Sequence, residues 1–232
     1  EARDSQKAFE LVEDSRARSL LDFVEADKPI AAVEKTFGPV TQPLSLAEIQ
    51  ARLPEQVQLV QYAVLPDKLA IWVVSKTRFD LIEKPIAAAE LEKKVTDYQA
   101  AIVRKESQAT IEPRAKELYQ LLIPSGLAGD KQLCLVPDKS LHQLAFASLV
   151  SPSGKYLLEE FALSYSPSAS VFIVATENAR RKSQVTSETL LSVGNPDFDR
   201  EENPNLPDLS SAAAEAKAGV PAKARRPVVT AQ

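Results

Sequence analysis

The sequence predicts an α/β protein of three layers, in which helices cover both faces of a mixed β-sheet. From residue 132 onward, short apolar runs alternate with helical patterns, which is typical of such layered folds. Upstream, two apolar runs are joined by a tight turn, and this β-hairpin adds antiparallel strands to the sheet. With 232 residues, 44% of them hydrophobic, the chain can bury a core without disulfides or a metal.

The first expected element is a helix over residues 4–27, because apolar side chains recur at three- and four-residue intervals up to the break at Pro29. Arg16 and Arg18 interrupt this apolar stripe. They could bind an acidic group, but solvated charges on a helix face are commoner, so we interpret both as solvated. Residues 35–43 have the glycine and proline content of a linker.

A short helix is expected next. Ser45 and Glu48 have the capping-box spacing that begins a helix, and Pro54 closes it. The nearly continuous apolar runs at 57–64 and 69–75 predict the two strands of the hairpin, with proline and aspartate in the turn between them.

Residues 78–85 alternate enough to add a third strand. Helical spacing returns at residues 91–102, and a second amphipathic helix is expected with Pro113 in its first turn and Leu122 near its end. Residues 132–136 predict a short buried strand.

The remaining elements continue the alternation. We expect a strand at 161–165, a helix at 168–182 that Ser168 caps, a strand at 190–193 and an alanine-rich helix that begins at Ser210 or Ser211 and ends at Gly219.

Composition disfavours several classes of function. The net charge is −4 and the basic residues are scattered, whereas nucleic-acid binding depends on clustered Lys and Arg, so we expect no nucleic-acid partner. The longest uncharged stretch, Phe161–Thr176, is too short and too polar to span a bilayer, so we expect no membrane partner. The single cysteine favours a reducing compartment, and we expect a cytoplasmic protein.

Candidate chemistry centres on Cys134 and His142, the only cysteine and histidine, because a thiolate nucleophile needs an imidazole within reach. Cys134 lies between leucines in an apolar strand, where burial raises the pKa of a thiol, so we favour a packing role for it. His142 follows a turn and is expected to be solvated or bonded to backbone. We therefore assign no catalytic residue in this chain.

Cofactor and metal sites are not predicted either. None of the six glycines falls in a phosphate-binding pattern, and one histidine with one cysteine would leave zinc dependent on carboxylates. Gly194-Asn195-Pro196 ends an expected strand, where ligands gather in open α/β sheets, but a simple turn is the favoured interpretation. We expect no cofactor and no metal.

A longer stretch of the sequence resembles a known protein family. Residues 133–149 read LCLVPDKSLHQLAFASL, and this string resembles the CHAT family, caspase-like proteins often found behind tetratricopeptide repeats in bacteria. Ala145 departs from it, since the family commonly has proline there. Further similar segments occur in the family's order at 118–124, 156–159, 164–168, 190–196 and 215–216.

The upstream residues extend the resemblance. Residues 15–21 look like the helix that links a repeat array to the CHAT region, and residues 45–82 look like the family's opening helix and hairpin. The resemblance implies a helical segment and linker at 1–44, the end of a repeat-like region, followed at 45–232 by the N-terminal, pseudo-caspase part of a CHAT domain. The implied fold is a caspase-like three-layer α/β sandwich.

The function implied is that of a cysteine peptidase whose histidine precedes its cysteine on adjacent strand ends. In the family both lie beyond the stretch that matches residues 227–232, and Cys134 and His142 occur in the wrong order. We therefore expect a non-catalytic half that supports a downstream catalytic half acting on a protein or peptide, and that couples it to a helical repeat domain. A non-enzymatic interaction module is the alternative, and a phosphate-handling enzyme is a weak third.

Overall fold

A computed structural model describes residues 2–27, 43–127, 132–183, 201, 211, 212 and 214. The chain divides into a compact unit that ends at Asn178 and a second unit that begins at Ala179, and the sheet lies within the first. The strand expected at 190–193 lies outside the described residues. Of the helix expected at 210–219, Ala212 and Ala214 are described, and both are helical.

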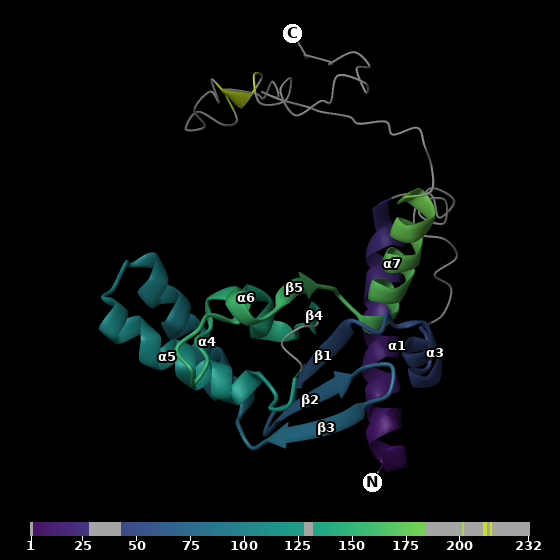
Figure 1. Cartoon of the computed structure of the whole chain (residues 1–232), viewed down its shortest axis with the longest axis horizontal. Coiled ribbons are helices and arrows are strands. Elements are labelled where there is room, and N and C mark those ends of the chain that lie inside the picture. Colours follow the sequence, from purple (N-terminus) through teal and green to yellow (C-terminus); the bar gives the residue numbers. More distant parts are fainter. Residues whose placement is uncertain are drawn as a thin grey trace. The chain divides into compact units, whose positions relative to one another are not determined.

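The first unit is built on a five-stranded sheet of order β3-β2-β1-β4-β5 (Figure 1). β2 pairs antiparallel with both β1 and β3, whereas β4 runs parallel to β1 and to β5. The mixed sheet and its hairpin are therefore confirmed. The strands are β1 (Val57–Val64), β2 (Leu69–Val74), β3 (Phe79–Lys84), β4 (Gln132–Val136) and β5 (Ala162–Tyr165).

Both faces of the central strands are covered, and every residue of β1 and β2 is buried. This burial explains why the two strands read as continuous apolar runs rather than alternating ones. One face packs against α4 (Ala88–Val103) and α5 (Gln108–Leu122), which form the crossover between β1–β3 and β4. We call this the α4/α5 face.

The opposite face, which we call the α1 face, packs against three other helices: α1 (Ala2–Asp27), α3 (Leu46–Arg52) and α7 (Ala169–Ser183). Phe9 of α1 is fully buried there, edge-on to the rings of Trp72 and Phe79 at centroid distances of 6.0 and 5.7 Å. The apolar stripe that predicted α1 is thus matched, near its start, by an apolar sheet face.

Two helix caps occur at the residues that the sequence predicted. The Ser45 backbone N–H donates to Glu48 Oε2 at 2.9 Å, and the Glu48 N–H donates to Ser45 Oγ at 3.4 Å, which confirms the capping box of α3. The Val171 N–H donates to Ser168 Oγ at 3.2 Å, so Ser168 caps α7 as predicted.

The predicted start of one helix was wrong. Pro113 lies inside α5 rather than in its first turn, because the helix begins at Gln108 and its first turn bonds to the Ser107 carbonyl. Proline has no backbone N–H, so α5 lacks one helical hydrogen bond at this position. The packing of the helix in the protein compensates for this loss. The sequence also failed to predict two 3-10 helices, η1 (Lys139–Gln143) and η2 (Phe146–Ser148), and the single turn α6 (Leu157–Glu160).

Candidate functional site

The carboxyl edge of the parallel strands is the first place to seek a site, because ligands in open α/β sheets bind where parallel strands end. β1 ends at Val64 and β4 ends at Val136, and the register between them places both ends at the same edge. Asp138 and Lys139 follow β4 directly.

Three charged side chains fill this edge. The guanidinium of Arg16 donates through Nη2 to the Tyr62 carbonyl at 2.5 Å and through Nη1 to the Val136 carbonyl at 3.5 Å. Asp138 Oδ2 accepts from the Val64 N–H at 2.7 Å, and Lys139 Nζ donates to the Val64 carbonyl at 2.6 Å. The backbone groups that could meet a ligand are therefore already bonded within the protein.

The electrostatics of Arg16 agree with a structural role. Only 14% of its side chain is exposed, and burial lowers the pKa of its guanidinium, while the charges of Asp138 and Glu13 oppose that shift. Arg16 Nη2 lies 3.7 Å from Asp138 Oδ1, which gives the buried cation an anionic neighbour.

The prediction that Arg16 is solvated was therefore wrong. Arg16 falls seven residues after Phe9, on the same face of the helix, so its position in the apolar stripe was a signal for burial. Solvated charges are commoner on average, but here the strand-terminal carbonyls and Asp138 replace the lost water. The side chain of Arg18 lies outside the described residues.

A second buried charge links α1 to α7. Glu13 is 0% exposed, and its carboxylate accepts from the backbone N–H groups of Ala169 at 3.1 Å and Ser170 at 3.0 Å. The Ser170 hydroxyl also donates to Glu13 at 2.9 Å and accepts from the Leu44 N–H at 3.0 Å. A carboxylate at the first N–H groups of a helix is a favourable arrangement, so Glu13 anchors α1 to the start of α7.

Cys134 and His142 do not form a catalytic pair in this structure. Cys134 is fully buried on the α1 face, and burial raises the pKa of its thiol to about 12, with a hydrogen bond to Ser164 acting in the opposite direction. His142 lies exposed in η1. The thiolate is the nucleophilic form of cysteine, and a raised pKa disfavours it at neutral pH. The burial predicted for Cys134 among apolar neighbours is confirmed.

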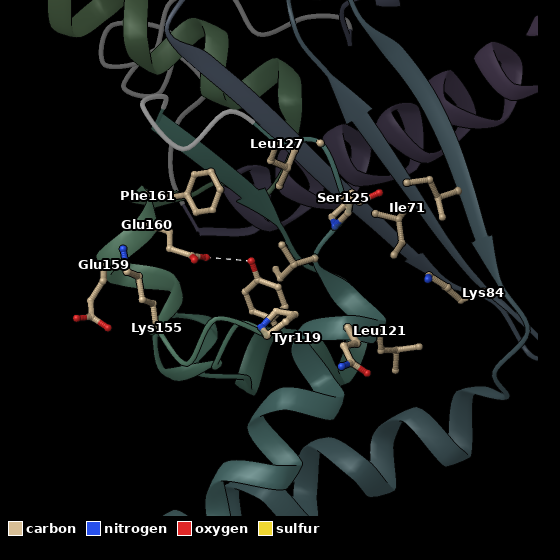
Figure 2. A pocket seen from close by; sticks show the side chains of 16 residues that line it. Ile71, Lys84, Tyr119, Leu121, Ser125, Leu127, Lys155, Glu159, Glu160 and Phe161 are labelled. Atoms are coloured by element: carbon tan, nitrogen blue, oxygen red, sulfur yellow. Dashed lines mark hydrogen bonds between the residues drawn. The ribbon is translucent and has the colours of Figure 1, made fainter.

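A hollow of about 760 Å³ opens beside the end of α5 (Figure 2). Tyr119 donates its hydroxyl to Glu160 Oε2 at 3.0 Å, and Figure 2 shows the two side chains facing each other across the hollow. The pKa of the Tyr119 phenol is raised to about 12, first by burial and then by the hydrogen bond to Glu160. Apolar walls come from β2, β3 and the segment after α5, through residues such as Ile71, Ile82 and Leu127.

The charges around this hollow do not select one kind of ion. Lys84 and Lys155 supply two ammonium groups, and Glu159 and Glu160 supply two carboxylates. Glu159 is engaged in capping α6, where it accepts from the Tyr156 N–H at 2.7 Å. The hollow therefore combines apolar walls with side chains of both charges.

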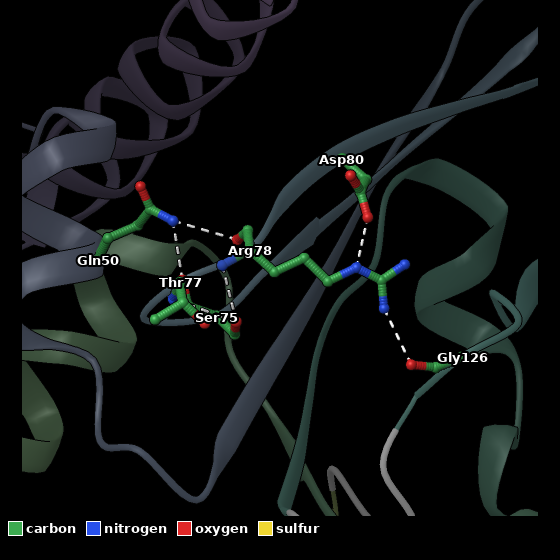
Figure 3. Close-up of polar contacts among 6 residues, drawn as sticks. All are labelled: Gln50, Ser75, Thr77, Arg78, Asp80 and Gly126. Carbon is green, nitrogen blue, oxygen red and sulfur yellow. Dashed lines mark hydrogen bonds and ion pairs between the residues drawn. The ribbon is translucent and has the colours of Figure 1, made fainter.

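Polar contacts also close the amino edge of β1, near the β2–β3 turn (Figure 3). The Gln50 amide of α3 donates to the carbonyls of Ser75 at 2.9 Å and Arg78 at 3.1 Å. The Arg78 guanidinium bonds to Asp80 and donates to the Gly126 carbonyl at 3.0 Å. These contacts position the turn and the loop after α5, and they present no reactive group.

Two further tests apply only to the part of the chain that the structure describes. Within it, His, Cys, Asp and Glu side chains nowhere gather in groups of three or more that could hold a metal ion. No helix among the same residues has the length and apolar character needed to cross a bilayer. Gly194-Asn195-Pro196, the turn at the end of an expected strand, lies outside the described residues.

Comparison with known families identifies the chain. The family model of the CHAT domain matches residues 112–227, a span of half the chain. The chain belongs to the CHAT domain family, and this relates it to caspase-like cysteine peptidases. The match begins within α5 and includes β4, β5 and α7, in agreement with the α/β fold. A search of curated proteins finds no match.

Proposed function

We propose that this chain is the non-catalytic, N-terminal half of a CHAT-type cysteine peptidase. The observation that carries the proposal is the carboxyl edge of β1 and β4, where Arg16, Asp138 and Lys139 bond to the strand ends. A catalytic half needs this edge open for its histidine and cysteine, whereas a supporting half can use the same atoms for packing.

The supporting role includes a downstream catalytic half and a repeat domain that senses a signal. α1 is well placed to couple them, because it contacts both the strand ends through Arg16 and the start of α7 through Glu13. On this proposal the substrate of the complete protein is a protein or peptide, and nucleic acid and membrane are not partners. The proposed location is the cytoplasm.

The experiment compares the full product of the gene with variants of this region. Cys134→Ala and His142→Ala should each leave the rate of peptide hydrolysis within about two-fold of the wild type, because neither residue takes part in chemistry. Alanine at a histidine and a cysteine encoded downstream should abolish hydrolysis. Hydrolysis that depends on Cys134 or His142 would refute the proposal.

An interaction module without enzymatic activity is the second candidate, and the exposed apolar side chains allow the two candidates to be tested against each other. Tyr156, Leu158 and Tyr165 are 44%, 56% and 53% exposed, around α6 and the edge strand β5. Half an enzyme should expose apolar surface when isolated, whereas a self-sufficient module should stay monomeric and should not bind an apolar dye. Strong dye binding by the isolated chain therefore favours the first proposal over the second.

A further inference from the structure

Gln61, at the centre of β1, is an unusual residue for its position. It is 0% exposed, and neither its Oε1 nor its Nε2 has a hydrogen-bond partner among the described residues. Its cross-strand partners Trp72 and Val136 both belong to the apolar cluster of the α1 face. Most buried side-chain amides are paired, so an unpaired one in a packed interface requires an explanation.

α1 crosses the sheet directly over this amide. Trp72 of β2 donates its Nε1–H to the Ser5 carbonyl at 3.3 Å, and Arg16 reaches the Val136 carbonyl of β4. β1 lies between β2 and β4, so the stretch of α1 from Ser5 to Arg16 passes over β1 at the level of Gln61. An unpaired amide beneath a docked helix would be hydrated if that helix moved away.

Several other contacts of α1 are polar, beside the apolar packing of Phe9, Ala8 and Val12. Glu13 and Arg16 are buried charges that bond to backbone groups of α7 and of the strand ends. Such charges are well hydrated when released, so their bonds in the docked state give a smaller net stabilisation than apolar packing of the same extent. The large, fully buried apolar anchor of this part of α1 is Phe9.

We propose that α1 is a releasable strap: its first part, from Ala2 to Arg16, opens from the sheet as a local unit while the rest of the fold stays intact. The unpaired amide of Gln61 sets how readily the strap opens. Opening withdraws Glu13 from the first N–H groups of α7 and Arg16 from the ends of β1 and β4. A change at the N-terminal helix is thereby transmitted to two other elements. The inference concerns packing within this chain and does not depend on the proposed peptidase.

Amide hydrogen exchange, followed by mass spectrometry on the 232-residue chain, tests the strap. Gln61→Met keeps the shape of the side chain and removes the unpaired polar group. We expect exchange in α1 to slow by about ten-fold, equivalent to about 1.4 kcal/mol, with exchange in α4 and α5 unchanged. Equal slowing in all three helices, or no slowing in α1, would overturn the proposal.

The matched control is Gln58→Met on the same strand. Gln58 is also buried, but it alternates to the α4/α5 face and has an interaction of its own. It should not slow exchange in α1, and slowing equal to that of Gln61→Met would contradict the role assigned to the unpaired amide.

Glu13→Gln tests the transmission to α7. An amide has one acceptor oxygen where the carboxylate uses both to meet Ala169 and Ser170, so this variant should loosen the strap. We expect exchange to accelerate by about ten-fold in α1 and at the start of α7 together, with α4 and α5 unchanged. Acceleration in α1 alone would contradict the coupling of the two helices.

Discussion

The two faces of the sheet are covered in different ways. On the α4/α5 face, the helices pack through apolar side chains such as Leu91 and Leu118, and buried tyrosines find backbone partners, as Tyr62 does with the Leu122 carbonyl at 3.1 Å. On the α1 face, Phe9 is accompanied by the buried charges of Glu13 and Arg16. Both faces bury an apolar cluster, and the α1 face adds buried charges that connect α1 to α7 and to the strand ends.

The largest effect is expected on the α4/α5 face. Leu118→Ala removes a side chain that is 1% exposed and leaves a cavity in the main apolar cluster, so the free energy of unfolding should fall by about 2–5 kcal/mol. Urea denaturation measures this loss. Alanine at the exposed neighbour Gln120 is the control and should change stability by less than about 0.5 kcal/mol. Equal effects at both positions would contradict the apolar packing of this face.

A smaller and local effect is expected from Glu13→Ala on the α1 face. This variant leaves the N–H groups of Ala169 and Ser170 without their carboxylate, and hydrogen bonds to charged groups contribute about 1.5–3 kcal/mol. The loss should appear in urea denaturation, and circular dichroism should show less helix at intermediate denaturant. A stability equal to that of the wild type would show that the contact does not hold α1 to α7.

The pH dependence of stability gives a third test on the α1 face. Burial raises the pKa of Cys134 from an ordinary value of 9.0 to about 12, so the folded state binds the thiol proton more tightly than the unfolded state. The contribution of this tighter proton binding to the stability of the fold is complete below pH 9. It is lost as the pH rises from 9 towards 12. Relative to the wild type, Cys134→Ala should therefore lose less stability over that window, as measured by urea denaturation at each pH.

Reagent accessibility is the companion measurement for Cys134. A thiol-specific disulfide reagent should react with the native chain at pH 8 only at the rate of unfolding, and fully in denaturant. Rapid reaction without denaturant would mean that the thiol is exposed.

A modest effect is expected in the hollow beside α5. Tyr119→Phe removes the hydroxyl that donates to Glu160, and a hydrogen bond of this kind contributes about 1 kcal/mol. Ultraviolet titration should also lose one tyrosine that ionises near pH 12. If the variant keeps every late-ionising tyrosine of the wild type, the environment assigned to Tyr119 is wrong.

The smallest effect concerns a half-exposed ion pair between α3 and α7. Arg52 donates to Glu177 through Nε at 2.8 Å and Nη2 at 2.6 Å, with side-chain exposures of 34% and 40%. Solvent screening limits such pairs, so Arg52→Ala should reduce stability by about 0.5 kcal/mol, and less in high salt. A loss above about 2 kcal/mol in thermal unfolding would mean that this pair, and not Glu13, is the main tie to α7.

Local patterns predicted most of the described fold because their physical causes are local. The capping box at Ser45, the hairpin turn after Val64 and the apolar spacing of α4 each depend on residues a few positions apart. The 3-10 helices after β4 carry no strong periodic signal, and so the sequence missed them.

The candidate site could be predicted only in part. The burial of Cys134 followed from its apolar neighbours, whereas the burial of Arg16 depends on carbonyls at Tyr62 and Val136, which are 46 and 120 residues away in the sequence. Propensity rules assign an isolated arginine to solvent because they do not include such distant partners. The unpaired amide of Gln61 could not be predicted either, because the sequence does not show whether a glutamine in a strand has hydrogen-bond partners.

Peptide hydrolysis by the purified 232-residue chain tests the central claim most directly. If the carboxyl edge serves packing, the chain should cleave no peptide substrate above the background of a heat-unfolded sample. Turnover that disappears in the Cys134→Ser variant would contradict the claim, because it would place the nucleophile inside a strand where the thiol is buried and burial raises its pKa.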